Sequence, residues 1–334
     1  MEVFNDQMMS NRSVCVIIVT FNRKQLLSEL LDDLLQQTYP VAGMVIVNNA
    51  STDGTEKLLI DRGIINGGET DRVVQSVWDN IVTYYYRNSK NEGGSGGFAK
   101  AFEIARDLPY EMVWAMDDDI SPASNCLEVL IGNLSEAVGV CVPCRNGDNW
   151  TDYVTVDYNL TNPLLVKLDD IKIKIDSTTL KGDYTRIIDM PMEGPLFRMD
   201  IVKTVGIPNK DYFIMFDDTD YAYRVSLVTE IHYIMNARLH RKLAIRQNLD
   251  EQEWTWKEYY LLRNQFYFDM QYGKNYLVRH FRPYFSSRMK LLSALMRRKY
   301  YRTSIIKRAY ADARHGKMGM VIKPGSDVVS GNEA

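Results

Sequence analysis

Three consecutive carboxylates, Asp117, Asp118 and Asp119, follow an apolar run that ends at Met116. Like charges this close repel one another, and burying them unpaired is costly. A hard divalent cation such as Mg²⁺ or Mn²⁺ removes this cost, because it takes oxygen ligands and keeps sites for water and phosphate. Alternate residues of an extended segment point to the same side, so Asp117 and Asp119 can converge while Asp118 faces elsewhere. We therefore predict a metal site here, with a solvated acidic turn as the alternative.

A second acidic cluster, formed by Asp217, Asp218 and Asp220, follows the apolar run 213–216. One of these carboxylates, if it lies near the metal site, can act as a general base. His240 comes later, after the strand-like residues 231–235. A lone histidine is usually structural, but His240 follows a strand-like run in a chain with only four histidines. We therefore leave two roles equally open for it, third metal ligand and structural residue.

Residues 91–98 read Asn-Glu-Gly-Gly-Ser-Gly-Gly-Phe and form a glycine-dense loop before a predicted helix. Such a loop lets the backbone approach a ligand closely, and the start of the following helix favours an anion. Glycine richness alone is also typical of a flexible loop. The spacing is neither that of a Walker loop nor that of the dinucleotide-binding motif.

The elements that must position these side chains alternate between strands and helices. Continuous apolar runs predict buried strands at 13–19, 44–48, 83–87 and 112–116. Helical spacing predicts helices at 23–37, 55–61 and 98–107, the first with Asn22 as its N-cap. This order indicates a parallel sheet with helices on both faces. The polar clusters after the strands would then meet at the carboxyl edge of the sheet, where ligands bind.

The alternation continues with a predicted helix at 127–138 and a strand at 139–142, whereas 191–197 and 213–220 are expected to be loops or strand ends. From residue 253 onward the pattern is helical, aromatic and increasingly basic. Cys141 and Cys144 have the spacing of a metal or redox pair, but no second pair accompanies them, so we expect buried thiols.

The net charge of −3 over 334 residues hides an asymmetry. Residues 1–273 carry 26 basic and 40 acidic residues, whereas residues 274–323 carry 14 basic residues and a single acid, Asp312. A basic segment beside an acidic body implies an anionic partner. The composition is that of an ordinary globular chain, and no segment has the length and hydropathy of a membrane span or a targeting signal. The expected location is the cytoplasm.

Leu291, Leu292, Leu295 and Met296 form a short apolar patch within the basic segment. Basic residues flank this patch: Arg288, Lys290, Arg297, Arg298 and Lys299. The pattern favours an amphipathic helix on an anionic membrane surface. A basic helix packed on the acidic body is the alternative. Nucleic acid is not an expected partner, because no nucleic-acid-binding motif accompanies the charge.

Together these motifs resemble the inverting glycosyltransferases of family two, which have the GT-A fold. The segments VIIVTFNR and VIVNNASTDGT, followed by an aspartate-rich motif after a strand, occur in the family's order across residues 13–245. The loop at 91–98 and the later sequence Trp-Ala-Met-Asp-Asp-Asp are similar to those of the galactofuranosyltransferase branch. The chain departs from the family in carrying Asn48 and Asn49 where aspartates are usual, and Asp217 where the family commonly has glutamate.

The resemblance implies a role for each matching position. Asp218 would be the catalytic base, while Asp217, Asp220 and Glu193 would support it or bind the acceptor. Asp117, Asp119 and His240 would hold Mn²⁺ or Mg²⁺. The donor would be bound by a larger set: Thr20, Phe21, Asn22, Asn49, Asp53, Asn91, Gly93, Gly94, Gly97, Asp118 and Arg263. For Arg263 a structural role is equally open.

The resemblance also implies an α/β fold of the GT-A type, Rossmann-like, with a mostly parallel sheet covered by helices on both faces and followed by a helical basic C-terminal region. We expect a nucleotide-sugar-binding and catalytic domain at 12–245, a helical, membrane-associating region at 246–323 and a flexible tail at 324–334.

The implied activity is inverting, metal-dependent transfer of a sugar, with galactofuranose from UDP-galactofuranose the leading donor. The acceptor would be a lipid-linked or cell-surface polysaccharide, and the protein would lie peripherally at the inner face of the cell membrane. Transfer of rhamnose or another hexose is the runner-up, and a homo-oligomer stays open. A nucleotidyltransferase or a non-catalytic glycan- or lipid-binding protein fits less well.

Overall fold

The computed structural model describes residues 13–147, 152–243 and 254–326. The predicted limits at residues 12 and 245 and most of the predicted tail fall outside these ranges. Within the described residues, no helix combines the length and the hydrophobicity needed to cross a bilayer.

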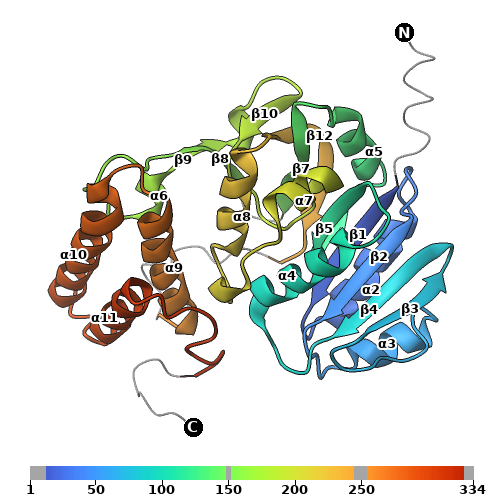
Figure 1. Cartoon of the computed structure of the whole chain (residues 1–334), viewed down its shortest axis with the longest axis horizontal. Coiled ribbons are helices and arrows are strands. Elements are labelled where there is room, and N and C mark those ends of the chain that lie inside the picture. Colours follow the sequence, from blue (N-terminus) through green and yellow to red (C-terminus); the bar gives the residue numbers. More distant parts are fainter. Residues whose placement is uncertain (1–12, 148–151, 244–253, 327–334) are drawn as a thin grey trace.

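A ten-stranded mixed sheet forms the centre of the molecule (Figure 1). Its middle strands are parallel neighbours in the order β5-β1-β2-β4, with bounds Met112–Asp117, Val14–Thr20, Gly43–Asn48 and Ile81–Arg87. Strand β1 is completely buried, which agrees with its unbroken apolar sequence. Because these strands are parallel, their carboxyl ends lie at one edge of the sheet.

The sheet continues beyond β5 with antiparallel β11 (Leu196–Arg198), followed by the parallel pair β7 (Val138–Gly147) and β12 (Glu230–Arg241). The remaining members are antiparallel partners: β3 (Val73–Trp78), β10 (Tyr184–Ile187) and the short β6 (Ile120–Pro122), which pairs with β12. Strands β8 (Tyr153–Tyr158) and β9 (Lys172–Asp176) form a separate two-stranded sheet.

Helices cover both faces of the large sheet. Helices α2 (Lys24–Leu35), α3 (Thr55–Asp61) and α5 (Cys126–Asn133) pack on the face that includes Val16 and Ile18. Helices α4 (Gly93–Arg106), α7 (Met199–Val205) and α8 (Asp217–Ser226) pack on the face that includes Ile17 and Val19. This alternation of side chains along β1 confirms the predicted α/β architecture.

The C-terminal part is helical, as predicted, and lies at the side of the molecule away from β3 (Figure 1). It consists of α9 (Trp256–Tyr272), a π-helical turn η3 (Leu277–Phe281), α10 (Arg282–Met296) and α11 (Tyr301–Arg314). Three short elements complete the fold: α6 (Leu168–Ile171), η1 (Ser177–Thr179) and η2 (Lys210–Tyr212).

Several predicted boundaries are wrong, for local reasons. The glycine-rich segment is not a loop, because α4 already begins at Gly93 and buries most of its glycines. The segment 213–220 is not a loop or strand end throughout, since α8 begins at Asp217. The helix expected to reach residue 138 ends at Asn133. Asn22 is not the N-cap of α2; the Asp53 carboxylate accepts the hydrogen bond from the Lys24 N–H instead.

Candidate active site

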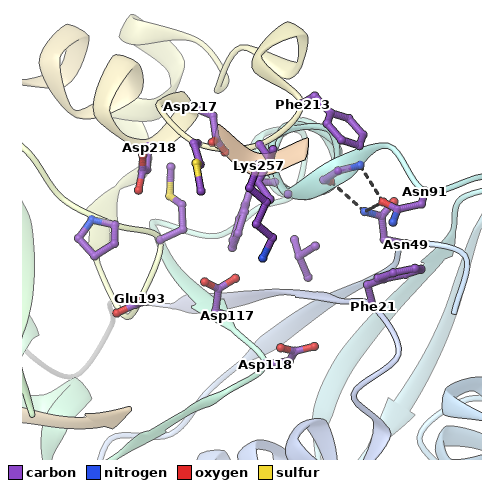
Figure 2. A pocket seen from close by; sticks show the side chains of 18 of the residues that line it. Phe21, Asn49, Asn91, Asp117, Asp118, Glu193, Phe213, Asp217, Asp218 and Lys257 are labelled. Atoms are coloured by element: carbon purple, nitrogen blue, oxygen red, sulfur yellow. Dashed lines mark hydrogen bonds between the residues drawn. The ribbon is translucent and has the colours of Figure 1, made fainter. Parts of the chain in front are cut away.

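A cleft of about 520 Å³ opens at the carboxyl ends of β1, β2 and β5, a volume in the range of small-molecule sites. Its wall is completed by the segments before β11 and α8 and by the start of α9. Figure 2 shows Asp117 and Asp118 on one side of this cleft and Asp217 and Asp218 on the other. The two acidic clusters, about a hundred residues apart in the chain, therefore share one cavity.

The strand-end aspartates differ in their surroundings. Asp118 accepts hydrogen bonds of 2.8 Å from the Thr20 hydroxyl and from the Arg23 guanidinium. Asp119 lies 3.4 Å from the same guanidinium, and its Oδ1 is buried without a hydrogen-bond partner. The predicted alternation is wrong here, because β5 ends at Asp117 and the chain turns, so that Asp118 lines the cleft and Asp119 does not. Asp117 lines the cleft, where burial and then the charges of Asp119, Glu193 and Asp118 raise its pKa well above the usual value. Arg23 thus supplies one positive charge to a cluster of three carboxylates.

Asp217 and Asp218 form the first turn of α8 and both line the cleft. Burial, followed by the charge of Asp218, raises the pKa of Asp217 to about 7. Burial, followed by the charge of Asp189, raises the pKa of Asp218 to about 6. A carboxylate whose pKa is close to the operating pH is suited to accept a proton during a reaction.

An ion pair supports Asp218 from the small sheet. Lys172 of β9 pairs with Asp189 and donates a 3.0 Å hydrogen bond to the Thr219 hydroxyl, next to Asp218. The positive charge of Lys172 lowers the pKa of Asp218 and partly offsets the effect of burial and of Asp189. This pair was not predicted from the sequence, because β9 belongs to a region without a clear hydrophobic pattern.

The glycine-rich start of α4 forms another wall. The Asn49 amide donates to the Asn91 side chain (3.0 Å) and to the Gly93 carbonyl (2.8 Å), which holds this segment beside β2 (Figure 2). A Cβ added at Gly93, where φ is +74°, would lie 2.0 Å from the Phe213 carbonyl oxygen. A Cβ added at Gly94 would meet no protein atom within 4 Å, so Gly94 borders open space in the cleft.

Gly97 has a different role from the one predicted. It does not line the cleft, and a Cβ there would lie 2.4 Å from Cγ1 of Val19. Its small size allows α4 to pack closely against β1. Of the predicted donor contacts at the end of β1, Phe21 lines the cleft and is 40% exposed, whereas Thr20 is buried against Asp118.

Asn22 and Asp53 organise the loop that follows β2 and do not line the cleft. The Asn22 side chain accepts a 2.7 Å hydrogen bond from the Thr52 N–H. Asp53 accepts from the N–H groups of Lys24 and Thr55, and these hydrogen bonds lower its pKa although burial opposes them. Both residues thus connect the loop after β2 to the start of α2.

Of the residues predicted to support the base or bind the acceptor, Glu193 lines the cleft and contacts two arginines, Arg145 at 3.2 Å and Arg241 at 2.7 Å. Asp220 does not line the cleft. Its carboxylate accepts a hydrogen bond from the Tyr212 hydroxyl (3.2 Å), which connects α8 to η2, and one from Arg224 (3.0 Å), one turn further along α8 itself.

His240 is not brought together with the aspartates. It lies on β12 opposite Ser121 of β6, is exposed and does not line the cleft. Throughout the described parts of the chain, no group of three or more histidine, cysteine, aspartate or glutamate side chains is arranged to hold a metal ion. A metal at this site would therefore rest on the strand-end carboxylates and on ligand oxygens.

For Arg263, the contacts agree with the structural alternative and not with donor binding. Its guanidinium is completely buried and donates to the carbonyls of Gly319 (2.8 Å) and Tyr212 (2.9 Å). The neighbouring Asn264 donates to the carbonyls of Ile214 (2.9 Å) and Met215 (2.8 Å).

The segment held by this pair has an unusual backbone. Phe213, Met215 and Phe216 all have φ between +64° and +68°, which is strained for residues with a side chain. Phe213 and Met215 line the cleft, and Phe216 precedes the aspartates of α8. The buried hydrogen bonds from α9 therefore fix the wall that carries the candidate base.

Sequence analysis missed Lys257. This residue, on the first turn of α9, extends its side chain into the cleft between the two acidic clusters (Figure 2). Arg23 and Arg241 are the other cations of the lining, and they are bound to Asp118 and Glu193. The only sequence signal was the position of Lys257 six residues before Arg263, which the family resemblance had singled out.

Residues 15–183 match the model of glycosyl transferase family 2, which is half of the chain. Two curated relatives are galactofuranosyltransferases named GlfT1. The one from Mycolicibacterium smegmatis is 25% identical over 212 residues, and the one from Mycobacterium tuberculosis H37Rv is 23% identical over 229 residues. The matches cover 64% of this chain and 65% and 64% of the relatives, so the chain spans about two thirds of their length.

Three solved structures have a similar fold. GalNAc-T7 with UDP, GalNAc and Mn²⁺ is 14% identical, with a TM-score of 0.55 and coverage of 91% of this chain and 55% of that one. The Pyrobaculum calidifontis mannosyltransferase PcManGT with GDP-Man and Mn²⁺ is 14% identical, with a TM-score of 0.54 and coverage of 92% and 89%. Staphylococcus aureus TarS 1–349 with UDP-GlcNAc is 13% identical, with a TM-score of 0.52 and coverage of 90% and 81%.

At these identities the structural likeness concerns the fold alone, and it confirms the predicted GT-A architecture. The curated relatives agree with the branch that the glycine-rich and aspartate-rich motifs indicated. The extent of the family match shows that the chain belongs to glycosyl transferase family 2.

Proposed function

We propose that the protein is an inverting, metal-dependent galactofuranosyltransferase that moves galactofuranose from UDP-galactofuranose to a lipid-linked or cell-surface polysaccharide, such as a capsule or an O-antigen. The observation that carries this proposal is the cleft in which Asp117 and Asp118 face Asp217 and Asp218. The galactofuranosyltransferase relatives support the choice of sugar.

The donor would bind along the carboxyl edge of the sheet. Phe21 and Asn49 would contact the nucleoside, and Asn91, Gly93 and Gly94 would let the backbone at the start of α4 approach the diphosphate. The first turn of a helix carries unpaired N–H groups and partial positive charge, which favours an anion. Lys257 would supply a full positive charge to the same diphosphate.

The strand-end carboxylates fit a divalent cation. Oδ1 of Asp119 is buried without a hydrogen-bond partner, and burial, followed by the charges of neighbouring carboxylates, raises the pKa of Asp117. We assign Mn²⁺ or Mg²⁺ to Asp117 and Asp119; His240 would join them only after β12 or its surroundings move. When bound, the cation would act as a Lewis acid toward the departing diphosphate. The GalNAc-T7 and PcManGT structures were obtained with Mn²⁺.

Asp218 would remove the proton from the acceptor hydroxyl as this oxygen attacks the anomeric carbon. A positioned general base contributes about 10²–10⁴-fold to a rate. Because attack would come from the side opposite the leaving group, a single displacement would invert the anomeric configuration. Asp217 would support the base, and Glu193, fixed by Arg145 and Arg241, would bind acceptor hydroxyls.

The first test is calorimetric titration with UDP in the presence and absence of Mn²⁺, for the wild type and for Asp117→Ala/Asp119→Ala. We expect Mn²⁺ to strengthen UDP binding in the wild type and to have no effect in the double variant. Asp32→Ala/Asp61→Ala, which removes two exposed carboxylates of α2 and α3, is the matched control.

The identity of the transferred sugar is tested by measuring the rate at which the protein releases nucleotide diphosphate from different nucleotide-sugar donors. Faster UDP release from UDP-galactofuranose than from UDP-galactopyranose would support the proposal, and preferential turnover of dTDP-rhamnose would replace it with the rhamnosyltransferase alternative. Failure to bind any nucleotide diphosphate, with or without Mn²⁺, would contradict a transferase active site altogether.

A further inference from the structure

A row of apolar side chains lies exposed along η3 and α10. Leu277, Phe281, Tyr284, Leu292 and Leu295 follow one another at intervals of three or four residues or multiples of them, and all are exposed among the described residues. This spacing places them on one side of the helix. Soluble surfaces rarely present so many large apolar groups together, and such patches usually mark an interaction site. With Arg288, which belongs to the same row, we call these residues the α10 face.

The α10 face is not the result of a loosely attached helix. Its opposite side includes Ser286 and Ala294, which are buried against the rest of the chain. Arg282, completely buried, pairs with Asp269 of α9 and donates a 2.6 Å hydrogen bond to the Asn159 carbonyl near the small sheet. The face is therefore held in a fixed position relative to the rest of the protein.

The segment that carries the α10 face is strongly basic, with 14 basic residues and one acid in 274–323. Lys274, Arg279, Arg288 and Arg298 are exposed on or beside it. The Arg288 guanidinium lies 4.9 Å from the centre of the Tyr284 ring, so its stem follows the apolar surface while its charge stays at the outside. The only acid in 274–323, Asp312 of α11, accepts a 2.7 Å hydrogen bond from the Tyr259 hydroxyl of α9.

We propose that the α10 face docks on an anionic phospholipid bilayer. Leucine and aromatic side chains with basic flanks are the composition that binds the interface between headgroups and acyl chains. Each Lys or Arg near an anionic membrane adds attraction that a neutral membrane lacks. A second copy of the chain is a poorer occupant, because pairing two such faces would bring their like charges together.

The docked orientation connects the membrane to the cleft. Helix α9 begins in the cleft with Trp256 and Lys257 and packs against α10 and α11. A bilayer on the α10 face would thus bring a lipid-linked acceptor close to the cleft. This consequence rests on the proposed function, whereas docking itself does not depend on the donor, the acceptor or the reaction.

The test is co-sedimentation of the full-length protein with vesicles of phosphatidylcholine, with and without phosphatidylglycerol. We expect binding that requires phosphatidylglycerol and that weakens at high salt. Leu292→Glu/Leu295→Glu should lower the partition coefficient at least about tenfold, because it removes two inserted side chains and adds negative charge. Arg288→Gln should lower it about fivefold, the effect of one charge near the surface.

A matched control uses two exposed apolar residues at the end of α8. Leu227 and Val228 are 67% and 50% exposed, compared with 49% for both Leu292 and Leu295. Leu227→Glu/Val228→Glu should therefore bind vesicles like the wild type. Thermal melts followed by circular dichroism show whether each variant is folded.

The proposal would be overturned if both double variants lost vesicle binding equally, or if the wild type bound vesicles equally well with and without phosphatidylglycerol. So would a wild-type dimer in sedimentation equilibrium that Leu292→Glu/Leu295→Glu dissociates, since the face would then be occupied by a second copy. UDP titration of the same variants keeps the two proposals apart: loss of vesicle binding with intact UDP binding concerns docking alone.

Discussion

Replacing Lys257 by alanine tests how the cleft accommodates a diphosphate. The lining contains the carboxylates of Asp117, Asp118, Glu193, Asp217 and Asp218. Without a cation an incoming diphosphate would meet mainly negative charge. Arg23 and Arg241 contribute less than their charge suggests, because Asp118 lies 2.8 Å and Glu193 2.7 Å from their guanidinium groups.

The size of the effect follows from the kind of contact. Two unit charges about 4 Å apart attract by about 4 kcal/mol at an effective dielectric constant of about 20. Lys257 has to give up bound water in an open cleft, so the measured range for hydrogen bonds to charged groups, about 1.5–3 kcal/mol, is the better guide. We expect Lys257→Ala to weaken UDP binding by about 10- to 150-fold.

Calorimetry with UDP and with uridine separates charge from shape. Uridine has no phosphate, so Lys257→Ala should leave its affinity unchanged, and Lys257→Arg should restore most of the affinity for UDP. Lys181→Ala, at an exposed position, serves as the control. Equal losses for UDP and uridine would show that Lys257 shapes the pocket rather than binds phosphate, and an unchanged UDP affinity would refute the electrostatic argument.

Three further outcomes are expected. Asp218→Asn should reduce the rate of sugar transfer by about 10²–10⁴-fold with little change in UDP affinity, and transfer that survives would remove Asp218 as the base. The value of kcat/KM should rise with pH to a plateau above about pH 6, because the raised pKa of Asp218 leaves this base protonated and inactive below that pH. Lys172→Met should shift this rise to higher pH, because the charge of Lys172 lowers the pKa of Asp218. Gly94→Val should weaken UDP binding at nearly constant Tm, because the added side chain would enter the open cleft. Gly97→Ala should instead lower the free energy of unfolding by about 1–3 kcal/mol, because the added methyl group would collide with Val19 of β1. The opposite pattern in calorimetry and thermal melts would contradict our assignment of the cleft wall.

Local chemistry explains why much of the fold could be predicted. The apolar run at β1 forms a strand because every one of its side chains is buried between two helical layers. The helix at Thr55–Asp61 matches its predicted limits, because its spacing and the preceding turn both act over a few residues. The start of α4 was missed because groups distant in sequence stabilise it despite the low helix propensity of its glycines. The Asn49 amide donates to the Gly93 carbonyl, and the Phe213 carbonyl accepts from the Ser95 N–H.

The residues of the candidate site likewise fall into two groups, those that the sequence identified correctly and those that it did not. Asp117 and Asp218 line the cleft, and their positions after apolar runs pointed to them. Asp118, which strand alternation placed elsewhere, also lines the cleft, whereas Asp119 does not. Gly97 and Arg263 belong to equally recognisable motifs but do not line the cleft, and the structure leaves His240 exposed on β12. Motif spacing identifies a segment, whereas the direction of each side chain depends on what packs beside it.

The sequence alone determined the alternation of strands and helices from β1 to β5, the placement of carboxylates at the end of β5, and the basic, apolar character of α10. These properties depend on steric preference, hydrophobic periodicity and charge within a few neighbouring residues. Only the tertiary structure decided that Lys257 reaches the cleft, that Arg263 and Asn264 hold a strained wall, and that Lys172 adjusts the pKa of Asp218. Each of these depends on contacts between distant segments, which arise when buried polar groups find partners as the chain packs.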